Sequence, residues 1–343
     1  QRLGIKHPIL LAPMAGVSTP ELAAEVSNQG GLGSLGLGAS TVEAAQQQIL
    51  ATQALTDQAF QVNFFCHESV QSDAASQQTW IDYLRPAFDK LNSPAPKALK
   101  CIYPSFKDHD DFLNLVLETQ PKAVSFHFGI PHPHQIQKLK DAGILTLVSA
   151  TNLAEARAIE AAGIDIIIAQ GSEAGGHRGI FNSTFDAAIA TTDLVHLITQ
   201  NCTLPVIATG GVMNGSQIKH MLNLGAKAVQ LGTAFVQCKT SSAHSAYRQA
   251  LLSQPITQVT ASISGRPARG IINHWQTEID LPDRPETAPY PYAYDLAKQL
   301  NALAIKNGDT GYGAFWAGSN VAQIRELEAR DLINQLIVEM NQV

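Results

Sequence analysis

Short apolar runs alternate along this chain with longer stretches of helical periodicity, and this pattern predicts an α/β fold. Eight such units follow one another within about 235 residues, as a closed (β/α)8 TIM barrel requires. Glycine and polar residues cluster after several of the runs, where this fold carries its binding loops. We therefore predict a TIM barrel with a smaller, mainly helical second domain, and an open doubly wound sheet is the competing fold.

The predicted strands are short, apolar and bounded by turn-forming residues. They lie at residues 9–12, 32–35, 60–64, 123–128, 145–149, 165–169, 205–209 and 228–231. A ninth apolar run, at 99–103, lies among prolines in the long connection between the third and fourth strands. We assign this run to an insertion rather than to the barrel.

The pattern changes near residue 238, where helical segments give way to a stretch rich in proline and tyrosine at 282–294. We predict that residues 1–237 plus 321–343 form the barrel domain and that 238–320 form the second domain, a substrate-covering lid. Apolar residues at helical spacing within 321–340 predict a closing helix that packs back on the barrel.

Charge and composition narrow the classes of partner. Lys and Arg total 23 and Asp and Glu total 29, for a formal net charge of -6, and no basic run is present, so we expect no nucleic acid partner. The 4 cysteines include no C-x-x-C pair, which argues against a disulfide framework and favours a reducing cytoplasm. No apolar stretch reaches the roughly 18 residues of a membrane helix, so we expect no membrane partner.

Glycine clusters at the ends of the predicted strands indicate a phosphorylated ligand. Gly210 and Gly211 follow the seventh strand, Gly232 follows the eighth, and a glycine-rich stretch at 170–179 follows the sixth. Bare backbone N–H groups can approach phosphate oxygens there, although a single glycine pair also serves a tight turn. The G-x-G-x-x-G match at 31–36 runs through a strand instead of following one, so it predicts no dinucleotide site.

His127 is the candidate catalytic residue. Alternation along the fourth strand turns residues 123, 125 and 127 toward the barrel interior and the bulky residues 124, 126 and 128 toward the helices. His127 then reaches the barrel mouth, where an imidazole can bind an oxyanion or accept a proton; a buried structural histidine is the alternative. His132 and His134 alternate with prolines and lack carboxylate or cysteine partners at a ligand spacing, so we predict no metal site.

Six stretches along the predicted barrel resemble the FMN-dependent nitronate monooxygenases, formerly called 2-nitropropane dioxygenases, in their bacterial class I branch. They are APMAGV at 12–17, NFF at 63–65, SFHFG at 125–129, AQGSEAGGHRG at 169–179, ATGGV at 208–212 and QLGT at 230–233. Weaker similarity extends into 264–270 and 313–318. The resemblance implies an enzyme that oxidises alkyl nitronates, such as propionate 3-nitronate, with O2 to a carbonyl product and nitrite or nitrate.

The resemblance also implies that the phosphorylated ligand is FMN. Its phosphate would rest on the loops after the seventh and eighth strands, and amide side chains would contact its ring or ribityl chain. The implied cofactor-binding residues are Ala12, Pro13, Met14, Asn63, Gln170, Gly175, Gly176, Gly210, Gly211, Gln230, Gly232 and Thr233. His127 would bind the nitronate oxygens or remove the α-proton of a neutral nitroalkane.

Four further residues are predicted to contact substrate. The stretch around His177 also resembles the FMN-dependent enoyl-acyl-carrier-protein reductases, in which the corresponding histidine is catalytic; here we expect a contact with substrate or the flavin edge, against loop capping. Tyr290, Tyr294 and Lys298 are spaced four apart and would form one stripe on a helix that gates a small anion, although such residues are also common on surfaces. Because prolines lie on both sides of Tyr290, the sequence does not predict at which residue that helix begins.

Two other functions stay open at this point. One is a reductase that passes hydride from NAD(P)H to an enoyl thioester. The other is a non-catalytic barrel that senses a phosphorylated metabolite. Neither the physiological substrate nor an oligomeric state is predicted.

Overall fold

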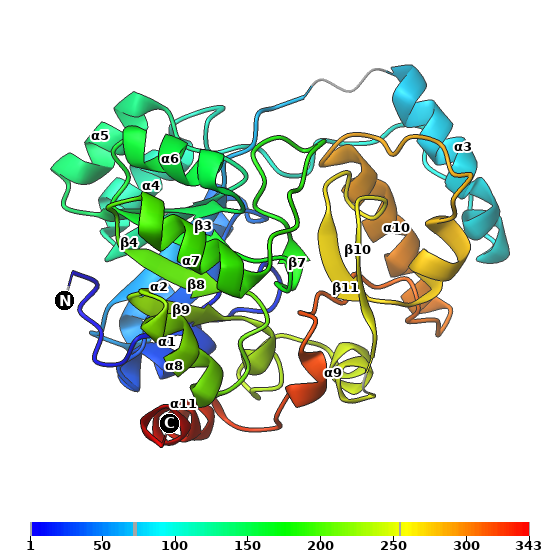
Figure 1. Ribbon diagram of the computed structural model, residues 1–343. Helices are drawn as coiled ribbons and strands as arrows, with labels where there is room; N and C mark the ends of the chain where they lie inside the picture. The colour runs from blue at the N-terminus through cyan, green and yellow to red at the C-terminus, as the bar shows by residue number, and fades with distance from the viewer. Residues whose placement is uncertain (1, 71–73, 254, 343) are drawn as a thin grey trace.

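Eight parallel strands form a ring in the computed structural model, which describes residues 2–70, 74–253 and 255–342 (Figure 1). The order around the ring is β1-β9-β8-β6-β5-β4-β3-β2, and a parallel bridge from Leu10 to Leu32 closes it. The predicted TIM barrel is confirmed, with every strand end within one residue of its prediction. The strands are β1 (Ile9–Leu11), β2 (Gly33–Gly36), β3 (Phe60–Phe65), β4 (Ala123–His127), β5 (Leu145–Ala150), β6 (Ile166–Gln170), β8 (Val206–Thr209) and β9 (Ala228–Leu231).

Helices cover the outside of the ring. Several begin at a polar residue whose side-chain oxygen accepts a hydrogen bond from a backbone N–H of the first turn, as Thr19, Thr41, Asn152 and Asn214 do. The barrel helices are α1 (Pro20–Asn28), α2 (Val42–Leu55), α4 (Asp111–Thr119), α5 (Pro133–Asp141), α6 (Leu153–Ala161), α7 (Thr191–Asn201) and α8 (Gly215–Asn223).

The closing helix is present but starts later than predicted. Helix α11 (Ala329–Asn341) contacts α8 and α1, so the end of the chain does pack on the barrel (Figure 1). The expected start at residue 321 is wrong, because that part forms a short 3-10 turn, η3 (Val321–Gln323), and then extended chain up to Glu328.

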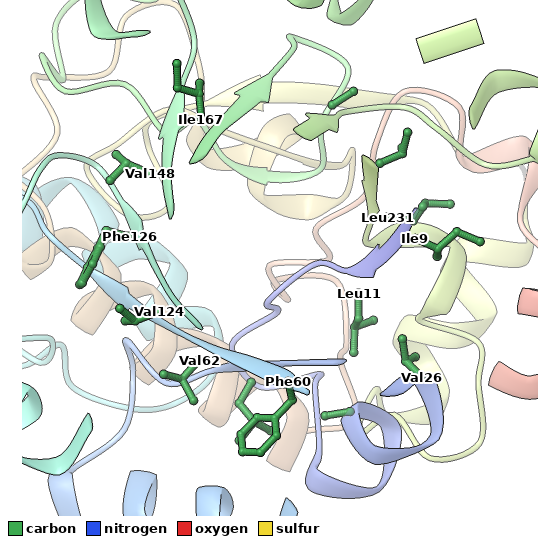
Figure 2. Packing of buried hydrophobic residues seen from close by; sticks show 14 of the residues in the cluster. Ile9, Leu11, Val26, Phe60, Val62, Val124, Phe126, Val148, Ile167 and Leu231 are labelled. Atoms are coloured by element: carbon green, nitrogen blue, oxygen red, sulfur yellow. The ribbon is translucent and has the colours of Figure 1, made fainter. Parts of the chain in front are cut away.

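The core has two layers, divided by the ring of strands. Alternate side chains, including Val62, Val124 and Phe126, point outward and pack against the helices (Figure 2). The others, including Ala123 and Leu147, fill the interior of the barrel. The predicted alternation along β4 is therefore confirmed up to His127, and this alternation is what turns the histidine inward.

Phe128 departs from that alternation. Strand β4 ends at His127, and Phe128 takes a φ of 76°, which swings its ring to the mouth of the barrel. There it packs with Tyr103 and Tyr290 instead of facing the helices.

A smaller unit covers the mouth of the barrel and contains both helices and a sheet (Figure 1). Its elements are α9 (Ser245–Leu252), the π-helix η2 (Trp275–Ile279), α10 (Tyr292–Lys306) and a three-stranded antiparallel sheet of β10 (Thr257–Thr260), β11 (Ala268–Ile271) and β7 (Gly176–His177). A 3-10 turn, η1 (Thr233–Phe235), follows β9 and leads into this unit. The sequence does not predict this sheet, since β7 has two residues and β11 contains arginine and glycine in place of alternating apolar residues.

The insertion after β3 contributes to the same unit. Helix α3 (Ala74–Lys90) packs against α10, and the two share a buried cluster that includes Trp80, Trp275 and Leu296. Residues 99–103 form no strand, as expected for an insertion. The division of the chain into two domains stays a prediction. No helix in the described part of the chain is long and apolar enough to span a bilayer.

Candidate active site

A pocket of about 840 Å³ opens at the carboxyl ends of the barrel strands, under α10 and residues 312–316. Its walls come from the loops after most of the strands and from the covering unit. Every sequence-predicted site residue except Tyr290 lines it: Ala12, Pro13, Met14, Asn63, His127, Gln170, Gly175, Gly176, His177, Gly210, Gly211, Gln230, Gly232, Thr233, Tyr294 and Lys298. The ring and the covering unit thus bring together residues as far apart in the chain as Ala12 and Lys298.

The loops after β8 and β9 leave backbone donors free at one end of the pocket. Among the hydrogen bonds of the described residues, none is donated by the amide N–H of Gly211, Gly232 or Thr233. Gly211 has a φ of 69°, and a Cβ placed on it would lie 2.8 Å from the Cβ of Glu173. Unpaired N–H groups on crowded glycine backbone are the donors that bind phosphate groups.

Amide side chains from three strands line the pocket. Asn63, Gln170 and Gln230 are each less than a tenth exposed. The amide of Gln170 is held on both sides, because its Oε1 accepts from the backbone N–H of Gly179 at 2.7 Å and its Nε2 donates to the His177 carbonyl at 2.9 Å. These amides supply fixed donors and acceptors, which a heteroaromatic ring with a polar edge requires.

His127 lies half-buried in the pocket with both ring nitrogens engaged. Its Nε2 is 3.0 Å from the His177 carbonyl oxygen, which can only accept, so Nε2 carries the hydrogen. Its Nδ1, 3.1 Å from Oγ of Ser149, then accepts from that hydroxyl. Burial lowers the pKa of His127 to about 4, against the effect of the His177 carbonyl. The imidazole is therefore neutral at neutral pH, with its lone pair on Nδ1.

His177, on strand β7, also donates from Nε2, but only this one of its ring nitrogens has a partner among the described residues. Oγ of Ser264 donates to the Arg266 carbonyl at 3.1 Å and accepts from Nε2 of His177 at 2.8 Å. Nδ1 of His177 has no hydrogen-bond partner among the described residues, so it is an acceptor at the pocket wall. Burial, with smaller contributions from His127 and Arg266, lowers the pKa of His177 to about 3. A neutral acceptor suits a ligand N–H or O–H better than an anionic oxygen.

The predicted stripe of two tyrosines and a lysine is only partly present. Helix α10 begins at Tyr292, so Tyr294 and Lys298 lie one turn apart on it and both line the pocket. Tyr290 precedes the helix and does not line the pocket; it is 4% exposed, and its ring centroid lies 5.9 Å from that of His177. Lys298 is the only Lys, Arg, Asp or Glu among the described lining residues, and its Nζ donates to the hydroxyl of Tyr103.

The described residues contain no group of three His, Cys, Asp or Glu side chains that would hold an ion. His134 instead lies on the surface, with its Nε2 3.2 Å from a carboxylate oxygen of Asp110.

The nitronate monooxygenase family model matches residues 1–339. This chain belongs to the nitronate monooxygenase family. A relative from Paraburkholderia phytofirmans named nitronate monooxygenase is 51% identical over 343 residues, which cover 99% of this chain and 94% of the relative. The crystal structure of nitroalkane oxidase from Streptomyces ansochromogenes is 35% identical, has a TM-score of 0.89, and is matched over 99% of this chain and 97% of that one.

FabK from Thermotoga maritima is a more distant neighbour. It is 28% identical with a TM-score of 0.74, and the match covers 99% of this chain and 94% of that one. As a member of the nitronate monooxygenase family, the chain is an oxidoreductase enzyme.

Sequence reasoning missed many residues of the pocket wall, and three of them lie next to predicted site residues. Tyr103 comes from the insertion after β3, where no motif marks it. Ser149 ends the predicted fifth strand, so its position at a strand's carboxyl end was an unused signal. Trp316 lies within a stretch of weak family similarity, and its ring centroid is 5.2 Å from that of His177.

Proposed function

We propose that this enzyme oxidises alkyl nitronates, such as propionate 3-nitronate, with O2 and that it uses FMN as its coenzyme. One observation carries the proposal: the wall of a single pocket contains backbone N–H groups that have no partner among the described residues, a neutral imidazole and an ammonium group. The family supplies the reaction class, and the pocket supplies a place for each reactant.

The residues present fit FMN. Gly211, Gly232 and Thr233 would bind the phosphate through unpaired N–H groups, with Gly175, Gly176 and Gly210 on the adjoining backbone. The ribityl chain and ring would lie along Ala12, Pro13, Met14, Asn63, Gln170 and Gln230. Bound FMN supplies the means of moving electrons from the nitronate to O2.

His127 would act as the proton acceptor for neutral nitroalkanes. Its neutral Nδ1 takes the α-proton once the Ser149 hydroxyl turns away, and the imidazolium so formed donates from Nε2 to the His177 carbonyl and from Nδ1 to Oγ of Ser149. A nitronate has already lost this proton, so it needs His127 only for binding and orientation.

Lys298 would hold the anionic substrate. Its ammonium is the one charged side chain among the described lining residues, and its hydrogen-bond partner Tyr103 is an uncharged phenol, since burial raises the pKa of Tyr103 to about 12. A cation without a carboxylate partner attracts a small anion into the pocket. The hydroxyl of Tyr294 lies on the same helical face, one turn away.

A FabK-like reductase has less support, because FabK is less similar to this chain. Anaerobic mixing separates the two functions. The holoenzyme is mixed with propionate 3-nitronate and, separately, with NADH while the flavin absorbance is followed. Bleaching by the nitronate and not by NADH is expected. Bleaching by NADH alone would favour the reductase, and purified protein that holds no flavin even after FMN is added would overturn the proposal.

A further inference from the structure

One short segment from the covering unit reaches three of the glycine loops at once. The backbone N–H of Gly318 donates to Oγ1 of Thr233 at 3.0 Å, in the loop after β9. The N–H of Ser319 donates to the carbonyl of Glu173 at 3.0 Å, in the loop after β6. The side-chain Nδ2 of Asn320 donates to the carbonyl of Gly211 at 2.6 Å, in the loop after β8. We call residues 317–320 the clamp segment.

The clamp segment also packs so closely on these loops that the glycines at the contact have no space for a side chain. A Cβ on Gly175 would lie 2.6 Å from the backbone of Ala317, and one on Gly318 would lie 2.9 Å from the carbonyl oxygen of Glu173. A Cβ on Gly211 would lie 3.1 Å from Nδ2 of Asn320. Glycine at these positions therefore lets several backbones converge, in addition to freeing N–H groups for a ligand.

The clamp segment is itself firmly held. Ala317 is fully buried, and its N–H donates to the Arg269 carbonyl at 3.3 Å. The carbonyl of Trp316 accepts from the hydroxyl of Tyr247. After the segment, Gln323 accepts from Nδ2 of Asn214 at 3.0 Å, which adds a second tie to the loop after β8.

We propose that Asn320 is a positioning residue for the FMN phosphate, an inference that rests on the proposed function. Asn320 lies outside the pocket wall but donates to the carbonyl of Gly211, whose own N–H has no partner in the described part of the chain. By holding the peptide group that follows Gly211, this bond restricts rotation about the left-handed Gly211 and so helps to fix the direction of its N–H. The covering unit thus organises the phosphate end of the coenzyme site as well as the substrate end.

The test measures coenzyme affinity in place of turnover. Apoprotein is titrated with FMN and, separately, with riboflavin, and the quenching of flavin fluorescence gives the two Kd values. For Asn320→Ala we expect the Kd for FMN to rise roughly three- to tenfold, the loss of about one hydrogen bond, while the Kd for riboflavin stays unchanged because riboflavin has no phosphate.

Asn201→Ala is the matched control, because Asn201 also donates from Nδ2 to a backbone carbonyl, that of Leu197 at 2.9 Å, but at the exposed end of α7. It should leave both Kd values as they are. An Asn320→Ala protein that binds FMN as tightly as the parent, or that loses FMN and riboflavin affinity equally, would overturn the inference. Thermal unfolding of each apoprotein checks that the variants are folded. If the parent protein itself fails to bind FMN, the proposed function fails instead.

Discussion

Replacing His127 by Asn removes the imidazole base but keeps a polar side chain in the pocket. With a neutral nitroalkane, we expect kcat/KM to fall by about 10²- to 10⁴-fold, the usual contribution of a positioned general base. With a preformed nitronate, the loss should stay within about tenfold, because only one or two hydrogen bonds are removed. The gap between the two losses measures the proton transfer itself.

The pKa of His127 sets the pH range for this experiment. A pKa of about 4 leaves the base neutral at pH 7, by ~1000 to 1 over its protonated form. Since burial has lowered the pKa, the protonated form accumulates only in acid. For nitroalkanes, kcat/KM should therefore be flat above about pH 5 and fall about tenfold for each unit below pH 4.

Oxygen consumption with a nitroalkane and its nitronate, followed across this pH range, provides the assay. Ser149→Ala is the control that keeps the imidazole and removes the hydroxyl 3.1 Å from Nδ1. It should lower the nitroalkane rate by only about three- to tenfold, the value of one hydrogen bond. Equal losses of both substrates in the His127→Asn enzyme would refute the assignment of His127 as the base.

Three further outcomes are expected. Lys298→Met should raise KM for propionate 3-nitronate about tenfold with little change in kcat. Lys298→Arg keeps the charge, so its KM should lie close to that of the parent enzyme. If Lys298→Met has the steady-state kinetics of the parent, Lys298 does not bind substrate. Gly211→Ala places a methyl group 2.8 Å from the Glu173 Cβ at a φ of 69°, so the Kd for FMN in fluorescence titrations should rise more than about tenfold. His67 is 2% exposed, and burial lowers its pKa to about 4. Between about pH 6.5 and pH 4, this side chain is therefore protonated in the unfolded chain and neutral in the folded chain. The free energy of unfolding should drop as pH falls from 6.5 to 4, by up to about 1.4 kcal/mol per unit from this residue, and His67→Gln should remove that share in urea titrations.

Much of the barrel was predictable, because a buried parallel strand needs an aliphatic run and its helix needs a capped, amphipathic stretch. Both signals are local: the strands at 165–169 and 205–209 contain aliphatic runs, and Asn214 caps the helix that follows the second of them. The antiparallel sheet of the covering unit was not predictable, since Gly176 and His177 pair with residues about ninety positions later and carry no strand pattern of their own.

The site residues that lie at the carboxyl ends of the barrel strands were predictable, and those from the covering unit were much less so. Glycines after β8 and β9 and His127 at the end of β4 must meet once the ring closes. Tyr290 illustrates the limit: spacing of four residues places it on a helix with Tyr294, but the helix begins only at Tyr292, and the ring packs behind His177 instead of facing the pocket.

The amino-acid sequence by itself determined the ring of strands, the family and the predicted site residues at the strand ends, because these depend on periodicity and motifs that a few neighbouring residues express. Only the tertiary structure decided which nitrogen of each histidine carries the hydrogen, which lining cation has no anionic partner among the described residues, and that Asn320 supports the turn at Gly211. Those properties depend on contacts between segments far apart in the chain, where burial and hydrogen-bond geometry, rather than local pattern, set the charge and direction of each group.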